Sequence, residues 1–166
     1  MFNLYKIKNF NYHKQKLINL IDQIPTNRCD IDGCKISHSD WNLHSNKSKE
    51  YKEYFFNNIY QDFGKQTCKN FNCDYTKIES LWFQVYKKND FHPLHRHGLS
   101  NFTNILYLNL PTKKTVTKIF DLNKKQLDFK IEEGDILTFP AFLLHQSPIN
   151  IDENPKYIIA FNMDIT

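Results

Sequence analysis

The chain has 166 residues and a formal net charge of +4, which predicts a single domain over residues 1–166 rather than several. Hydrophobic residues make up 40% of the chain and charged residues 24%, so we expect a packed core and no disorder over the whole length. The apolar runs are far shorter than the roughly 20 residues that cross a bilayer, and the N-terminus lacks a secretory pattern, which favours a cytoplasmic protein without a membrane partner.

Residues 1–75 are predicted to be a helical support region. Apolar side chains recur at helical spacing over residues 12–24, which end before Pro25, and over residues 48–63. These side chains are Leu17, Leu20, Ile21 and Ile24 in the first segment, and Tyr51, Tyr54, Phe55, Ile59 and Tyr60 in the second. Each set lies on one helix face, so we expect two helices that pack against the rest of the chain.

The pattern changes to short apolar or alternating segments over residues 76–166. We expect strands at residues 78–87, 93–97, 103–110, 116–121, 127–131, 135–139, 144–149 and 157–163. Turn-forming residues such as Asn89-Asp90 and Asn154-Pro155 separate several of them. The sequence therefore predicts an α+β protein whose core is a double-stranded β-helix (a cupin-like jelly roll), with the N-terminal helices packed outside.

The four cysteines form two C-x4-C pairs, Cys29/Cys34 and Cys68/Cys73. Zinc sites usually have closer spacings within each pair, and a chain without a secretory pattern is expected to keep its thiols reduced. We therefore expect ordinary reduced cysteines. A zinc site that joins the two pairs, or a disulfide, is the less favoured alternative.

Arginine is rare, since Arg28 and Arg96 are the only two among 22 basic residues. Recognition of nucleic acids depends on arginine side chains and on clusters of basic residues, and the lysines of this chain are scattered. We therefore do not expect a nucleic-acid partner.

Three histidines occur close together in the segment His92-Pro93-Leu94-His95-Arg96-His97. On a strand, His95 and His97 point to the same face and Arg96 points away, so one strand can supply two neighbouring metal ligands. The plainer interpretation is a solvated strand that responds to pH.

A further histidine, His145, follows a turn and an apolar strand that begin at Gly134. A lone histidine among apolar residues is normally a hydrogen-bonded core residue. A jelly roll can nevertheless place its strand opposite the H-x-H strand, which would complete a face of three histidines. Imidazole ligands suit iron, zinc, copper and nickel.

In this arrangement the sequence resembles the 2-oxoglutarate- and Fe(II)-dependent oxygenases, and in particular small members common in phage and marine bacterial genomes. The resemblance covers about residues 80–163 and rests on several segments in the same order. They are Trp82-Phe83-Gln84-Val85-Tyr86, the His95/His97 pair, Thr103 to Tyr107, Gly134 to Pro140, His145, and Lys156 to Asn162. For a phage protein, the expected compartment is the host cytoplasm.

The resemblance implies that His95, His97 and His145 are the catalytic iron ligands. Most of the wider family has a carboxylate where this chain has His97, so the usual set of two histidines and one carboxylate becomes three histidines. Asp90 or His92 could complete the site instead. Three neutral ligands leave the site one negative charge short, which should weaken iron retention.

The resemblance also implies a site for the co-substrate 2-oxoglutarate. Where the family carries an arginine followed two residues later by serine, this chain has Lys156 and Ile158. Lysine supplies the positive charge without the bidentate geometry of arginine. We expect Lys156 to bind the distal carboxylate, with Tyr107 or Thr103 as hydroxyl partners. Arg96 is an alternative cation, and Lys156 could instead be a solvated residue before an edge strand.

The activity implied by the resemblance is a dioxygenase reaction that uses Fe(II), 2-oxoglutarate and O2 and hydroxylates a protein side chain or a small molecule. Aromatic and polar residues could wall the pocket, although aromatic residues at strand spacing more often form core; they are Trp82, Gln84, Tyr86 and Phe139. Two alternatives stay open. One is a cupin-like dioxygenase with three histidines that does not use 2-oxoglutarate, and the other is a non-catalytic jelly-roll module for binding or structure.

Overall fold

Two antiparallel sheets form the centre of the protein, as a computed structural model shows. The structure describes residues 1–25, 28–30, 33–41 and 49–166. The larger sheet has the strand order β1-β8-β5-β10-β3-β2, and the smaller has the order β4-β9-β6-β7. The strands are β1 (Asn3–Lys6), β2 (His38–Ser39), β3 (Thr76–Tyr86), β4 (His92–His95), β5 (Phe102–Asn109), β6 (Lys118–Phe120), β7 (Gln126–Leu127), β8 (Asp135–Pro140), β9 (His145–Ser147) and β10 (Lys156–Ile165).

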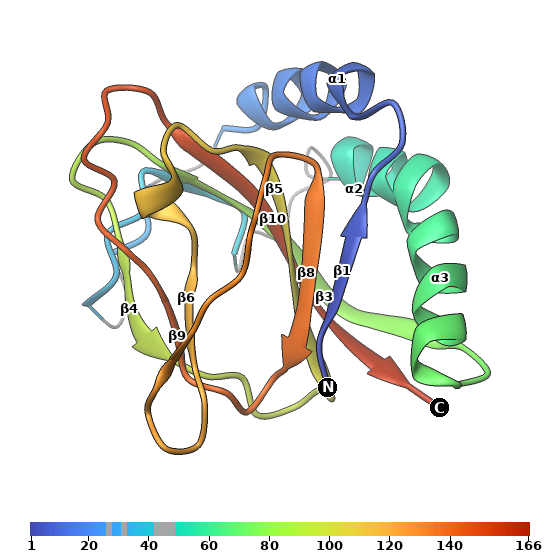
Figure 1. Ribbon diagram of the computed structural model, residues 1–166. Coiled ribbons are helices and arrows are strands. Elements are labelled where there is room, and N and C mark those ends of the chain that lie inside the picture. The colour runs from blue at the N-terminus through green and yellow to red at the C-terminus, as the bar shows by residue number, and fades with distance from the viewer. Residues whose placement is uncertain (26–27, 31–32, 42–48) are drawn as a thin grey trace.

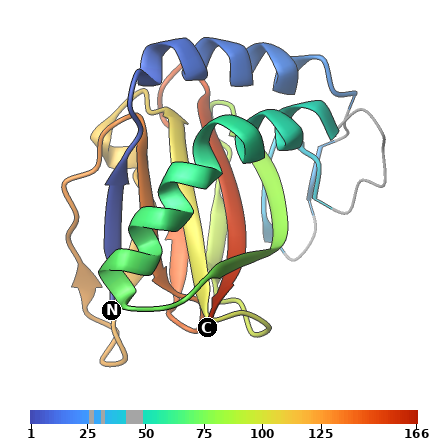
Figure 2. The ribbon, with the colours of Figure 1, turned by 90° about the vertical axis from the view of Figure 1, so that its right-hand side faces the viewer.

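The helices cover the face of the larger sheet that points away from the smaller sheet (Figures 1 and 2). They are α1 (Phe10–Asp22), α2 (Lys49–Phe55) and α3 (Gln61–Phe71). This arrangement confirms the predicted jelly-roll core with helices packed outside. None of the helices described is long and apolar enough to cross a membrane.

Side chains that alternate in direction along the strands divide the apolar interior into two cores. On β3, Phe83 belongs to the core beneath the helices, whereas its neighbours Trp82 and Gln84 line a pocket between the two sheets. Successive side chains of a strand point to opposite faces, so one strand serves both layers. The central strands β5, β10 and β3 are therefore largely buried on both faces, with the pocket on one of them.

The core beneath the helices consists largely of aromatic rings. Phe161 of β10 packs against Phe55 and Phe63, with ring centroids 5.3 and 5.5 Å apart, and all three side chains are fully buried. Such offset and edge-on pairs add to the free energy gained from burial alone. The helices thus pack against the face of β10 that is opposite to the pocket.

Each of the eight predicted strands is present, with ends shifted by a few residues. The first predicted helix ends at Asp22 instead of residue 24, because the residue before Pro25 is disfavoured in helical geometry. The second prediction, 48–63, was too short, because a π-helical turn at Phe56–Tyr60 leads directly into α3. Its first residue, Ser48, lies outside the described residues.

The sequence did not predict β1 or β2. In β1, Leu4 is 47% exposed and Asn3 is buried, so the apolar alternation that marks a strand is missing. Asn3 is instead held by polar contacts with α3, since its Oδ1 accepts a hydrogen bond from Asn70 Nδ2 at 2.8 Å. β2 has only two residues, too few to produce a pattern.

Candidate metal centre and adjoining pocket

The smaller sheet brings the separated histidines together. β4 and β9 are antiparallel neighbours, and their register pairs His95 directly with His145. His97 follows the end of β4, where its backbone N–H donates to Ala141 O at 2.9 Å. The strand pairing therefore produces the face of three histidines that the sequence predicted.

The three imidazoles could hold one metal ion. One ring nitrogen from each of His95, His97 and His145 lies within 4.8 Å of the others, and among the described residues no other group of three or more possible ligands is found. The two cysteine pairs therefore do not combine into a zinc site within this part of the chain. The ring centroids are 4.2–5.3 Å apart.

Hydrogen bonds orient each ring in the same way. The Nδ1 atoms of His95 and His145 lie 2.8 Å from Pro93 O and 3.0 Å from Leu143 O. His97 Nδ1 lies 2.7 Å from the Oδ1 atom of Asn162. Because each partner is an acceptor, Nδ1 carries the proton and donates it, which leaves the lone pair on Nε2. This is the tautomer that binds a metal through Nε2.

Burial keeps these histidines neutral. It lowers the pKa of His95 to about 4, and it also lowers the pKa of His97 and that of His145. The neighbouring imidazoles act in the same direction at His95 and His145. A metal ligand must be a neutral imidazole, so the site is ready for a cation at neutral pH.

Of the two alternative metal ligands, Asp90 lies outside the group of three histidines and His92 lies beside it. Asp90 is not a member of the cluster, because its carboxylate accepts hydrogen bonds from Ser37 N and Lys87 N and pairs with Arg28. His92 does lie beside the cluster, with its ring stacked on His95 at 3.8 Å between centroids. It lines the same pocket but does not belong to the group of three.

Lys156 is buried next to the pocket-lining residues Ser147 and Tyr86, so the alternative of a solvated lysine is wrong. Its side chain has no exposed surface, and Nζ donates to Thr115 O at 2.7 Å and to Ser147 Oγ at 2.9 Å. Nζ also lies 5.1 Å from the centroid of the Tyr86 ring. Burial lowers the pKa of Lys156 to about 7, because the charged amine loses its hydration and no carboxylate among the described residues pairs with it.

Tyr107 and Thr103, the predicted hydroxyl partners, differ in their surroundings. The Tyr107 hydroxyl is buried without a hydrogen-bond partner among the described residues, and Lys156 Nζ lies 5.9 Å from its ring centroid. Thr103 Oγ1 instead donates to Asn162 Oδ1 at 3.0 Å, the same atom that orients His97. A buried hydroxyl without a partner costs free energy. A buried amine and an orphaned hydroxyl beside the pocket are a donor set that suits a carboxylate.

The pocket continues outward into a groove of about 450 Å³. Trp82, Gln84 and three of the histidines border both spaces. Of the predicted wall residues, Tyr86 also lines the pocket, whereas Phe139 belongs to the core between the sheets and packs edge-on against His145. Arg96 is exposed and lines the groove, whereas Lys156 is fully buried.

Two residues near the site were not identified as functional from the sequence. Asn162 holds His97, and the only signal was a polar residue within the apolar run from Ile158 to Met163 of β10. Trp41 lines the groove and packs on Trp82 with centroids 4.5 Å apart. It lies in a segment without a periodic pattern, so no signal could have revealed it.

Comparison with known proteins supports the fold. No model of a known protein family matches the chain, and no curated protein matches it by sequence. Among solved structures, the chain is similar to an oxidoreductase of the 2OG-Fe(II) oxygenase family from Burkholderia pseudomallei, with a TM-score of 0.76 at 10% identity over 98% of this chain and 84% of that one. It is also similar to the viral collagen prolyl hydroxylase of Paramecium bursaria chlorella virus 1, with a TM-score of 0.54 at 18% identity over 96% and 94% of the chains. A prolyl-4-hydroxylase from Pseudomonas putida has a TM-score of 0.53 at 13% identity over 97% and 91%.

Proposed function

We propose that this protein, which has the fold of the 2-oxoglutarate- and Fe(II)-dependent oxygenases, is itself a dioxygenase of that kind. One observation carries the proposal: three histidines with free Nε2 atoms line a pocket, and beside it lie a buried lysine, which is hydrogen-bonded to the pocket-lining Ser147, and an orphaned tyrosine hydroxyl. The first group is suited to a metal ion and the second to a carboxylate. Together they match the two ligands that such an oxygenase binds.

His95, His97 and His145 are the proposed iron ligands. Bound Fe(II) would supply open coordination positions for 2-oxoglutarate and O2. The protein holds the rings in one tautomer through Pro93 O, Leu143 O and Asn162 Oδ1, so no ligand reorientation is needed when the ion enters. Because all three ligands are neutral, the site keeps the full charge of the cation, which favours an anionic co-substrate.

Lys156 is the proposed partner of the distal carboxylate of 2-oxoglutarate. The protonated amine supplies one charge-assisted hydrogen bond, and the Tyr107 hydroxyl can supply a second donor. The Tyr86 and Tyr107 rings exclude water around Nζ, which strengthens the electrostatic attraction. The co-substrate would then lie between this end of the pocket and the histidines.

The groove above the histidines is the proposed site of the primary substrate, a protein side chain or a small molecule that is hydroxylated. The similar structures include two prolyl hydroxylases, which supports a protein side chain as one of these candidates. Of the described residues that line the groove, Arg96 is the only one with a fixed charge, and none of them is a carboxylate. A neutral or anionic substrate is therefore favoured over a cationic one.

Turnover without the primary substrate tests the proposal. Fe(II)-loaded protein should convert 2-oxoglutarate slowly to succinate and CO2 with O2, and His145→Ala should lose this activity together with its iron. Lys156→Met should keep iron but need about 10- to 100-fold more 2-oxoglutarate, because it loses a hydrogen bond to a charged group. Iron binding without any O2 consumption would favour the non-catalytic jelly-roll module. Consumption of O2 on adding candidate substrates but without 2-oxoglutarate would favour the three-histidine cupin-like dioxygenase.

A further inference from the structure

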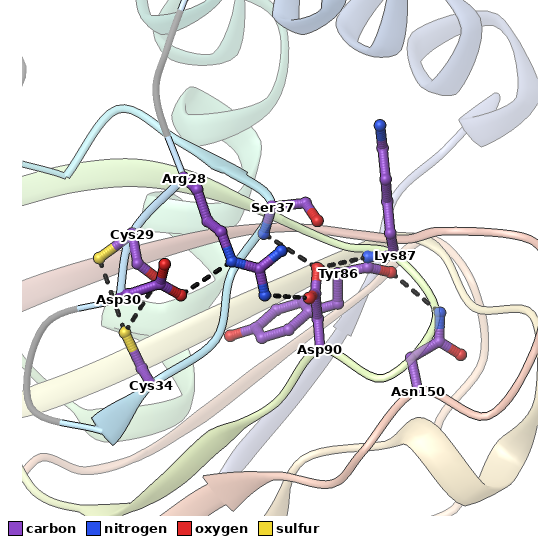
Figure 3. A network of polar contacts seen from close by, with 9 residues as sticks. All are labelled: Arg28, Cys29, Asp30, Cys34, Ser37, Tyr86, Lys87, Asp90 and Asn150. Carbon is purple, nitrogen blue, oxygen red and sulfur yellow. Dashed lines mark hydrogen bonds and ion pairs between the residues drawn. The ribbon is translucent and has the colours of Figure 1, made fainter.

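A short segment that contains two cysteines lies beside the turn between β3 and β4 (Figure 3). Cys29 and Ile36 exchange two backbone hydrogen bonds, of 2.9 and 3.0 Å. Cys34 Sγ lies 3.6 Å from Cys29 Sγ and donates to Cys29 O at 3.4 Å. The two sulfur atoms are thus in van der Waals contact without a bond between them.

Polar contacts to one buried carboxylate fix residues on both sides of the cysteine pair to the body of the protein. The carboxylate of Asp90, which is 1% exposed, accepts hydrogen bonds from Ser37 N and Lys87 N and pairs with Arg28 Nη2, each at 2.9 Å (Figure 3). These contacts lie on both sides of the cysteine pair in the sequence. Arg28 and Ser37, which flank the pair in the sequence, therefore hold the backbone in a position that keeps the two sulfur atoms close together.

We propose that Cys29 and Cys34 are a modification site that closes into a reversible disulfide at the wall of the groove. A disulfide bond is about 2.05 Å long, so the sulfur atoms need to approach by only about 1.6 Å from their present separation of 3.6 Å. Cys29 is half-buried and lines the groove, whereas Cys34 is 6% exposed. This asymmetry makes Cys29 the attacking thiol and Cys34 the resolving one.

The reaction needs a low-mass disulfide as oxidant. The Cys29 thiolate attacks one sulfur of the oxidant, which forms a mixed disulfide and releases one thiol. The Cys34 thiolate then attacks Cys29 Sγ, which forms the Cys29–Cys34 bond and releases the second thiol. Each cysteine loses one proton and the pair gives two electrons to the oxidant, so one disulfide replaces another.

A metal at this pair is not supported by its surroundings. A structural zinc site needs four ligands, and no third metal-ligating side chain joins the two cysteines among the described residues. The proposed disulfide does not need iron.

The proposed disulfide lies near residues that surround Lys156. Cys34 and Tyr86 belong to one buried cluster, and Lys156 Nζ lies over the Tyr86 ring. The disulfide therefore involves the same buried cluster as a neighbour of the proposed co-substrate site.

The test uses the full chain with Cys68→Ser and Cys73→Ser, so that only one pair of thiols is present. The reduced protein is incubated with oxidised glutathione, alkylated to block remaining thiols and weighed as an intact chain. We expect loss of two hydrogens without alkylation, and recovery of both thiols with dithiothreitol. With Cys34→Ser added, the protein should stop at one glutathionyl group on Cys29. With Cys29→Ser added instead, it should react at least tenfold more slowly, because Cys34 is buried.

Three results would overturn the inference. One is two alkylated thiols after the incubation, and another is a stable mixed disulfide in the protein that retains both Cys29 and Cys34. The third is equal reaction rates for the Cys29→Ser and Cys34→Ser proteins. Cys34→Ala serves as a second variant if Cys34→Ser fails to fold, since it also removes the resolving thiol from the buried position.

Discussion

Lys156 should make the binding of 2-oxoglutarate depend on pH in a characteristic way. In the free protein, burial lowers the pKa of this lysine to about 7, and its hydrogen-bond partners Thr115 O and Ser147 Oγ are uncharged. A carboxylate placed against Nζ favours the charged amine and raises its pKa. Binding of 2-oxoglutarate is therefore coupled to the uptake of a proton above neutral pH.

The sign and size of the effect follow from this coupling. The affinity is full below the pKa of the free protein and falls as the pH rises through about 7, up to the higher pKa of the complex. If the pKa in the complex is about 10 or higher, the dissociation constant increases about 50-fold between pH 7 and pH 9. This corresponds to about 2 kcal/mol of binding free energy.

The assay is an anaerobic titration of the Fe(II)-loaded protein with 2-oxoglutarate between pH 6 and pH 9. Lys156→Arg is the matched control, because arginine stays charged over this range and should remove the slope. Lys156→Met should bind weakly at every pH. A dissociation constant in the unchanged protein that stays constant from pH 7 to pH 9 would refute the reasoning, as would an equal slope in Lys156→Arg.

Three further results are expected. Iron affinity in a chelator competition should fall far less between pH 7.5 and pH 5.5 than the about 1000-fold that three unperturbed histidines would lose, because burial lowers the pKa of all three ligands, that of His95 to about 4; a loss of about 1000-fold would contradict this. Asn162→Leu should weaken iron binding about 10- to 100-fold, because His97 loses its acceptor, whereas Asn162→Asp should retain it; equal affinities would contradict this role. Phe63→Ala should lower the free energy of unfolding in urea by about 3–5 kcal/mol and leave iron affinity unchanged, because Phe63 lies in the core beneath the helices.

The sequence was most informative where a pattern repeats along the chain. The strands of residues 76–166 could be predicted because apolar residues and turn residues alternate there, and the H-x-H spacing placed His95 and His97 on one face. His145 was predicted to join them only through the assumed jelly roll. In the structure the strands of His95 and His145 do lie opposite each other, with these two residues paired.

Other features depend on contacts between distant segments and have no local signal. The buried Lys156 amine is hydrogen-bonded to Thr115 and Ser147, which lie on different segments. A sequence pattern therefore could not tell a buried amine from a solvated one. The same holds for Asn162, whose role appears only when β10 is placed beside His97. The division into a helical support region and a core, and the cytoplasmic location, remain predictions.

The central claim is that the three histidines and Lys156 bind Fe(II) and 2-oxoglutarate in one pocket. The most direct test is an anaerobic titration of the Fe(II)-loaded protein with 2-oxoglutarate that follows the weak visible metal-to-ligand charge-transfer band of the chelate. We expect the band in the unchanged protein, its loss together with bound iron in His95→Ala, and its appearance only at higher 2-oxoglutarate concentrations in Lys156→Met. Absence of the band while iron is bound would contradict the account.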